Sequence, residues 1–143
     1  MFYRLASIKN KLDQEWPSLF KNQFPILANS KLWFDEWAAH GTCSFKYFNF
    51  FQYFDVSIKI YERIKINDIL QKEGIIPGQE YDKYNIVNAI ARTIQFQPQI
   101  RCEEFQNLSY LLEVRICFTA SKDPQYKDCD TPFSNCGAKY VSL

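Results

Sequence analysis

The segment LWFDEWAAHGTCS, at residues 32–44, concentrates the side chains of this chain that are suited to chemistry. It contains the one histidine of the sequence, His40, four residues after Glu36. Because residues at i and i+4 share a face of a helix, a helix here would place the carboxylate beside the imidazole, and Trp33 beside Trp37. An unperturbed imidazole titrates near neutral pH, so the pair suits acid–base chemistry, although surface contacts of this kind are more frequent than sites.

The composition is that of a folded globular chain, and we expect one domain over residues 1–143. Hydrophobic residues make up 47% and charged residues 23%, which excludes a disordered chain. A formal net charge of +1 provides no basic surface for non-specific binding of DNA or RNA. No apolar run reaches the roughly 18 residues of a membrane helix, and the N-terminal residues lack the pattern of a signal peptide.

Hydrophobic periodicity predicts helices in the first two thirds of the chain. The first is expected to end before Pro17, and the second to begin after Ser30 as its N-cap and to carry the segment quoted above. The second helix has Ser30 as its N-cap and extends through His40, and the other predicted helices lie at residues 3–16, 47–64, 67–72 and 80–94. The aromatic residues at helical spacing in the third helix are typical of core packing rather than of a cofactor site.

After Pro98 the sequence becomes β-branched and partly alternating, which predicts strands. These are expected at residues 100–102, 110–118 and 138–143, with a polar, cysteine-bearing loop at 120–136. Helices followed by strands are the order of an α+β domain.

Four of the five cysteines lie in the last third of the chain: Cys102, Cys117, Cys129 and Cys136. Their spacing favours disulfides and an oxidising compartment, whereas a zinc site would need a C-x-x-C pair or a nearby histidine. The odd one, Cys43, is a free thiol, forms an intermolecular bond, or lacks a partner. The sequon Asn107-Leu108-Ser109 fits a secreted chain and predicts glycosylation at Asn107.

The segment WFDEWAAHGTCS closely resembles the second active-site segment of the ribonuclease T2 family, W-x-x-E-W-x-K-H-G-T-C. The stretches YFDVSIKIYERIKINDILQKEGIIPGQEY, IVNAIARTI, QIRC and LLEVRICF are similar to the plant S-RNase branch of that family. The resemblance extends from Trp16-Pro17 to Cys136. It implies the ribonuclease T2 fold, with helices packed on one side of an antiparallel sheet. It also implies extracellular cleavage of single-stranded RNA without a metal or another cofactor.

The resemblance assigns roles to individual residues. In this family two histidines cleave RNA by transphosphorylation through a 2′,3′-cyclic phosphate; one abstracts the ribose 2′-hydroxyl proton and the other protonates the leaving 5′-oxygen. His40 corresponds to one of them, the general base in the usual assignment, and Glu36 to the accompanying carboxylate. The family lysine, which stabilises charge on the phosphorane, falls on Ala39. Trp33 and Trp37 are expected to contact the substrate.

The chain also departs from the family pattern. The first family histidine lies in a segment resembling I-H-G-L-W-P, which this sequence lacks, and no second histidine replaces it. A cysteine after that segment pairs with the HGTC cysteine in the family, so Cys43 is expected to be unpaired. The other cysteines correspond to nested bridges, Cys102–Cys136 around Cys117–Cys129. We therefore expect a chain shortened at its N-terminus, with the first strands of the sheet missing.

Two functions are expected, in order of preference. The first is a T2-type endoribonuclease that acts on single-stranded RNA as a secreted, glycosylated monomer. Its activity is expected to be weak or undetectable, because the general acid–base help of a second histidine contributes on the order of 10²–10⁴-fold. The second is a non-catalytic S-RNase-like recognition protein, whose partner would be an F-box protein in pollen rejection during self-incompatibility. An unstable product without a role is a third alternative. No DNA, membrane, metal or cofactor is expected as a partner.

Overall fold

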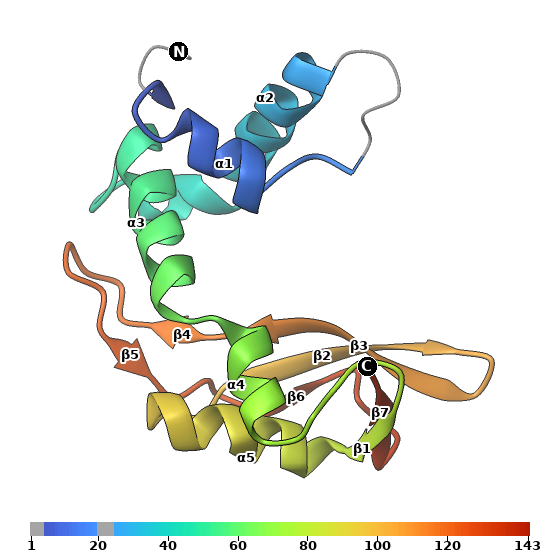
Figure 1. The fold of residues 1–143 in the computed structure, drawn as a ribbon. Helices are drawn as coiled ribbons and strands as arrows, with labels where there is room; N and C mark the ends of the chain where they lie inside the picture. The colour runs from blue at the N-terminus through green and yellow to red at the C-terminus, as the bar shows by residue number, and fades with distance from the viewer. Residues whose placement is uncertain (1–4, 20–24) are drawn as a thin grey trace. The chain divides into compact units, whose positions relative to one another are not determined.

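The computed structural model describes residues 5–19 and 25–143, and the chain divides into two compact units at Ile64 and Lys65 (Figure 1). Whether these units make up one domain over residues 1–143 stays a prediction. The first unit is helical, with α1 (Lys9–Glu15), α2 (Pro25–Glu36), the π-helical turn η2 (Trp37–Gly41), the 3-10 turn η3 (Thr42–Ser44) and α3 (Phe50–Arg63). The second unit contains α4 (Ile66–Lys72), β1 (Glu80–Asp82), α5 (Lys83–Ile94), β2 (Gln99–Phe105), β3 (Leu108–Arg115), β4 (Cys117–Phe118), β5 (Tyr126–Lys127), β6 (Phe133–Ser134) and β7 (Tyr140–Ser142).

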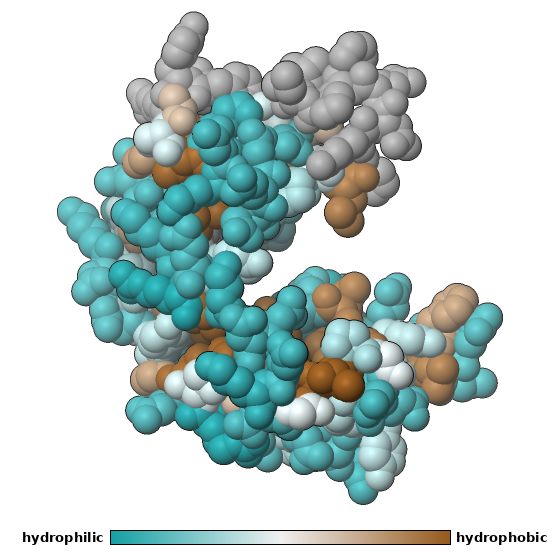
Figure 2. All heavy atoms as spheres, viewed as in Figure 1, coloured by the Kyte–Doolittle hydropathy of each residue, from teal (hydrophilic) through white to brown (hydrophobic). Residues whose placement is uncertain are grey.

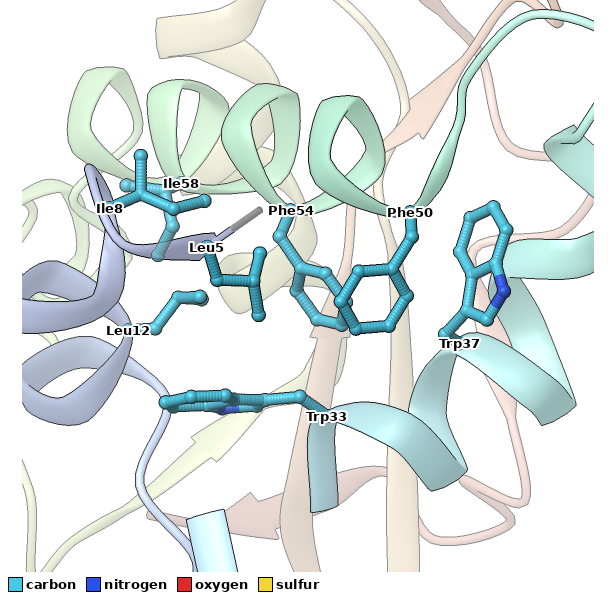
Figure 3. Close-up of a cluster of buried hydrophobic side chains, with 8 residues drawn as sticks. All are labelled: Leu5, Ile8, Leu12, Trp33, Trp37, Phe50, Phe54 and Ile58. Atoms are coloured by element: carbon cyan, nitrogen blue, oxygen red, sulfur yellow. The ribbon is translucent and has the colours of Figure 1, made fainter. Parts of the chain in front are cut away.

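The core of the first unit is built on one face of α3. Phe50, Phe54 and Ile58 recur every four residues and are buried, as the helical period requires. They meet buried side chains from α1, α2, η2 and the residues just before α1: Leu5, Ile8, Leu12, Trp33 and Trp37. Figure 3 shows the rings of Phe50 and Phe54 pointing from α3 toward Trp33, with Trp37 beside Phe50. The predicted packing role is confirmed for Phe50, Phe54 and Ile58, whereas Tyr61 at the same helical spacing is exposed.

Local polar groups set where α3 begins. Asn49 is its N-cap, and its side-chain oxygen accepts a hydrogen bond from the Gln52 amide at 3.0 Å. The Gln52 side chain accepts one in return from the Asn49 amide, also at 3.0 Å. This capping box satisfies two backbone donors that a helix start leaves open, so the predicted helix over 47–64 begins only at Phe50.

Two other helix boundaries differ from the prediction. Helix α2 begins at Pro25 rather than after Ser30, because proline has no N–H to satisfy and is favoured in a first turn. Ser30 is buried inside the helix and does not cap it. Helix α1 begins at Lys9, later than the predicted helix over 3–16, of which residues 3 and 4 lie outside the described residues.

The predicted helix over 80–94 divides into a strand and a helix. Residues Glu80–Asp82 form β1, which pairs with β7, and α5 begins only at Lys83. Asp82 is the N-cap of α5, since its carboxylate accepts a hydrogen bond from the Tyr84 amide at 2.9 Å. The period of the apolar residues fits a helix, but the cap residue Asp82 is only the third residue of the predicted range.

The main sheet has the strand order β1-β7-β3-β2-β6, so the predicted α+β class is confirmed. It is a mixed sheet rather than an antiparallel one. The pairs β1–β7 and β2–β3 are antiparallel, whereas β2–β6 and β3–β7 are parallel. The chain reaches β6 and β7 through the long loop after β3 rather than through tight hairpins, and such connections allow parallel neighbours. Helix α5 packs on β6, with the ring of Tyr84 set 4.9 Å from that of Phe133.

Two disulfides fasten the second unit. Cys102 on β2 bonds Cys136, and Cys117 on β4 bonds Cys129. These are the two bridges that the family resemblance implied. All five cysteines lie within the described residues, and Cys43 is left free and exposed. Within residues 5–19 and 25–143, no helix is long and apolar enough to cross a membrane.

Candidate active site

The segment around His40 is a π-helical turn added to the end of α2. The Thr42 amide donates to the Trp37 carbonyl, five residues back, instead of four as in an α-helix. Single π turns are uncommon and occur frequently at functional sites. Glu36 is the last residue of α2, and His40 lies in the turn that follows it. Both candidate residues therefore lie on one short helical stretch, as the sequence predicted.

Gly41 is the residue that allows this turn to pack closely. It is buried, and a Cβ placed on it would come within 2.2 Å of Cε3 of Trp37. The indole therefore lies directly against the glycine backbone, and any larger residue would push it away. The glycine after His40 is required by packing rather than by an unusual backbone angle.

Three side chains after His40 close the helical stretch. Each donates a hydrogen bond to a backbone carbonyl three or four residues back. The last carbonyls of a helix have no backbone partner within the helix. The bonds are Thr42 Oγ1 to the Ala38 carbonyl at 3.2 Å, Cys43 Sγ to the His40 carbonyl at 3.0 Å and Ser44 Oγ to the Gly41 carbonyl at 2.6 Å. The GTCS sequence thus holds the backbone around His40.

Trp37 connects this turn to α3. Its ring centroid lies 5.7 Å from that of Phe50 and 5.5 Å from that of Tyr53, both in edge-to-face contacts. Such aromatic pairs stabilise beyond the apolar area that they bury. Trp37 is therefore held in place by two rings of α3. These contacts in turn fix the π turn that carries His40.

Both candidate substrate-binding tryptophans lie in the core. Trp33 is 1% exposed and Trp37 8% exposed, and Nε1 of Trp33 donates a hydrogen bond to the Trp16 carbonyl at 2.9 Å. Their contact with substrate stays a prediction, while their burial gives both a packing role. Two exposed aromatic rings lie near them in the sequence, Phe34 and Phe45, and the ring centroid of Phe45 lies 6.4 Å from that of Trp37. The hydrophobic pattern of the sequence did not identify Phe45 as a candidate.

His40 itself is exposed, and Glu36 is half-buried one turn before it. Ala39 is also exposed and stands where the family resemblance expects a lysine. The His40 side chain is therefore accessible from solvent. Among residues 5–19 and 25–143, no three histidine, cysteine or acidic side chains gather as metal ligands would.

Tyr53 is a member of this site that the sequence did not reveal. Burial raises the pKa of its phenol above the ordinary value of 10.0, and the negative charges of Glu36 and Cys43 raise it further. The phenol therefore lies within electrostatic reach of Glu36 and stays protonated. In the sequence Tyr53 is one of many aromatic residues of α3, and its position beside Glu36 depends on how α3 packs.

A surface depression lies in the second unit. It has a volume of about 700 Å³ and is lined in part by Arg101, Glu103 and Leu112. The Arg101 guanidinium in it is bound to the Glu113 carboxylate at 2.9 Å. Its size does not make it the site, because the histidine and its neighbouring carboxylate lie in the first unit.

These features define a disulfide-bonded α+β protein whose exposed histidine, next to a carboxylate on one helical stretch, suits acid–base chemistry on an accessible substrate. Residues 3–129 match the Ribonuclease T2 family, and the chain belongs to that family. The family prediction made from residues 33–44 and the later stretches that resemble S-RNases is confirmed.

Individual relatives agree with this assignment. The chain is 32% identical to Ribonuclease S-2 of Nicotiana alata over 124 residues, which cover 87% of this chain and 56% of that protein. It is 32% identical to Extracellular ribonuclease LE of Solanum lycopersicum over 137 residues, covering 94% of this chain and 58% of that protein. Its fold is similar to that of ribonuclease MC1 from bitter gourd seeds, with a TM-score of 0.88, 24% identity, and coverage of 100% of this chain and 72% of that one. The chain thus spans about half the length of the curated relatives that it matches.

Proposed function

We propose that this chain is a T2-type endoribonuclease that binds single-stranded RNA and cleaves it weakly, with His40 and Glu36 as its catalytic residues. The observation that carries the proposal is the exposed His40 on the π turn that directly follows Glu36, the last residue of α2, in a ribonuclease T2 family member. The two disulfides and a relative named as extracellular support action outside the cell.

In this mechanism the neutral imidazole of His40 takes the proton of a ribose 2′-hydroxyl. The resulting oxygen attacks the adjacent phosphorus in line, the bond to the 5′-oxygen breaks, and a 2′,3′-cyclic phosphate forms. The negative carboxylate of Glu36 stabilises the positive charge that His40 gains with this proton. Water protonates the leaving 5′-oxygen, because the sequence holds a single histidine. The lack of a positioned acid lowers the rate on the order of 10²–10⁴-fold relative to a two-histidine site.

Ala39 lowers the rate further. A cation at this position would stabilise the charge that builds on the phosphorane, and a methyl group does not. Deleting one preorganised stabilising group from other enzymes lowers kcat on the order of 10²–10³-fold. Slow cleavage is therefore expected from this chain by itself.

The test is product analysis with single-stranded RNA, comparing the chain with the variant His40→Ala in the presence of a chelator. We expect slow release of fragments ending in 2′,3′-cyclic phosphate, and its loss in His40→Ala. An oligoribonucleotide whose 2′-oxygens carry methyl groups cannot be cleaved, so it separates binding from chemistry through the NMR signal of His40. Cleavage that persists in His40→Ala, or an unchanged His40 signal at saturating oligonucleotide, contradicts the proposal.

A second candidate function is recognition without catalysis, as in an S-RNase-like protein that binds an F-box protein. Ala39 and the single histidine favour it, because a binding role needs neither of the missing catalytic groups. Its distinguishing expectation is that partner binding survives His40→Ala unchanged, while RNA cleavage by the unaltered chain is undetectable. Pull-down of a pollen F-box protein by both proteins would measure this.

A further inference from the structure

Strand β2 runs past its outer neighbour and leaves part of its edge open. Strand β6 pairs with β2 only at Ile100 and Arg101, whereas β2 continues to Phe105. Figure 1 shows the β2–β3 hairpin projecting beyond the short strand β6. Among the strands of residues 25–143, none pairs with β2 on this side after Arg101. A strand edge of this kind has unpaired backbone groups that can pair with another chain.

The hairpin geometry identifies the backbone groups that this edge presents. Phe105 pairs with Leu108 across a two-residue turn, and the residues that flank such a turn exchange both of their backbone hydrogen bonds. Hydrogen-bonded and non-hydrogen-bonded pairs alternate along an antiparallel ladder. Glu104, opposite Ser109, therefore forms a non-hydrogen-bonded pair. Its amide and carbonyl point away from β3, so a strand added at this edge would find one donor and one acceptor there.

The surface depression of the second unit lies at this same edge. Its volume of about 700 Å³ falls within the range of roughly 300–1,000 Å³ that is usual for ligand pockets. It is lined by residues 101–104 of β2 and by Gly137 and its neighbours in the loop from β6 to β7. Gly137 faces open space, since a Cβ placed on it would meet no atom within 4 Å. The loop therefore leaves room beside β2 for a further segment of chain.

Two acidic side chains without partners line this depression. Glu103 and Glu104 are exposed, and within residues 5–19 and 25–143 neither carboxylate forms a hydrogen bond or an ion pair. The nearest cation along the strand, Arg101, is bound to Glu113 instead, with its Nη1 2.9 Å from a carboxylate oxygen. The depression therefore offers two uncompensated negative charges, which favour a positively charged occupant.

The same charges oppose a second copy of this chain as the occupant. Open strand edges can pair with each other, and two copies would then align their β2 edges. That pairing would bring together Glu103 and Glu104 of both copies. Like charges that face each other across paired strands are destabilising. The edge is therefore suited to a partner of opposite charge rather than to itself.

We propose that the open edge of β2 binds an extended segment of a partner protein that carries two consecutive lysine or arginine residues and adds to the sheet as a further strand. Successive side chains of a strand point to opposite faces, so Glu103 and Glu104 lie on opposite faces of the sheet. Two consecutive basic side chains alternate in the same way, and each meets one carboxylate. The backbone of the segment bonds the amide and carbonyl of Glu104.

An apolar residue beside the basic pair would add to the contact. Phe105 lies on the same face of β2 as Glu103 and is 59% exposed. Figure 2 shows apolar surface at this end of the hairpin, at the right of the view. An apolar side chain two positions from one of the cations would lie against it. The edge belongs to the second unit and His40 to the first, so binding at the edge needs no catalytic residue.

The binding test uses the full chain and a fluorescein-labelled peptide, TVKKVTV, with both ends blocked. We expect saturable binding in fluorescence anisotropy and shifts of the NMR amide signals of Glu103 and Glu104. The peptide TVEEVTV should not bind. A version of TVKKVTV with methyl groups on the backbone nitrogens of both lysines keeps the charge but cannot add as a strand, so it should not bind either. Failure of TVKKVTV to bind, or equal affinity of the methylated peptide, overturns the proposal.

The location of the site is tested with variants of the chain. Glu103→Gln combined with Glu104→Gln should weaken binding of TVKKVTV about 2- to 30-fold, the effect of losing two cross-strand charge pairs. The matched control combines Asp123→Asn with Asp130→Asn, which removes the same charge from exposed residues that do not line the depression. It should leave the affinity unchanged. Equal affinities of the two double variants overturn the site.

Sedimentation of the unaltered chain distinguishes a second copy from a peptide partner. We expect a monomer at the concentration used for the peptide titration, with and without TVKKVTV. A dimer that TVKKVTV dissociates would show that a second copy occupies the edge, and it would overturn the proposal.

Discussion

Gly41 is the residue on which the geometry of the histidine turn depends most directly. We expect Gly41→Ala to destabilise the fold by about 1–3 kcal/mol, because its methyl group would overlap the ring of Trp37. Gly137→Ala is the matched control, since a Cβ there meets no atom within 4 Å. Urea unfolding of both variants measures the difference. Equal effects of the two substitutions would show that the contact with Trp37 carries no constraint.

Tyr53 gives the site an alkaline pH dependence. The pKa of its phenol is raised by burial and by the charges of Glu36 and Cys43, so folding favours the protonated form. That contribution to stability is complete below the ordinary value of 10.0 and is lost as pH rises through the higher pKa of the folded state. We expect Tyr53→Phe to flatten the fall in stability at alkaline pH. Tyr140→Phe, on an exposed ring of β7, is the control and should leave the slope unchanged.

At the scale of secondary structure, the sequence predicted which segments are helices and strands better than where they begin. The apolar period of α3 and the short helix at Ile66–Lys72 follow from residues near in sequence. The split of residues 80–94 does not, because β1 forms only by pairing with β7 at the other end of the chain. The parallel pairs of the sheet depend in the same way on contacts distant in sequence.

The two disulfides make a prediction at this scale. They close segments of 34 and 12 residues, and a longer closed loop restricts the unfolded chain more. Replacing Cys102 and Cys136 together by alanine should cost about 4 kcal/mol, and replacing Cys117 and Cys129 about 3 kcal/mol. Denaturant unfolding compares them. A larger cost for the shorter bridge would contradict the loop-entropy account.

At the scale of the whole molecule, the family was predicted by the resemblance of residues 33–44 and of later stretches, such as LLEVRICF, to segments of the ribonuclease T2 family. The contribution of Tyr53 was not predictable, since it comes from α3 through tertiary packing. Nor was the burial of both tryptophans, because the sequence shows their shared helical face but not which way that face points.

The central claim is that His40 transfers a proton in RNA cleavage and that Ala39 limits the rate. Ala39→Lys tests it most directly, with Ala38→Lys as a control that adds the same charge at the neighbouring exposed position. The measurement is the initial rate of 2′,3′-cyclic phosphate formation from single-stranded RNA. We predict that Ala39→Lys raises this rate on the order of 10²-fold, that Ala38→Lys does not, and that adding His40→Ala abolishes the gain. Equal rates for the two lysine variants, or a gain that survives without His40, would contradict the account.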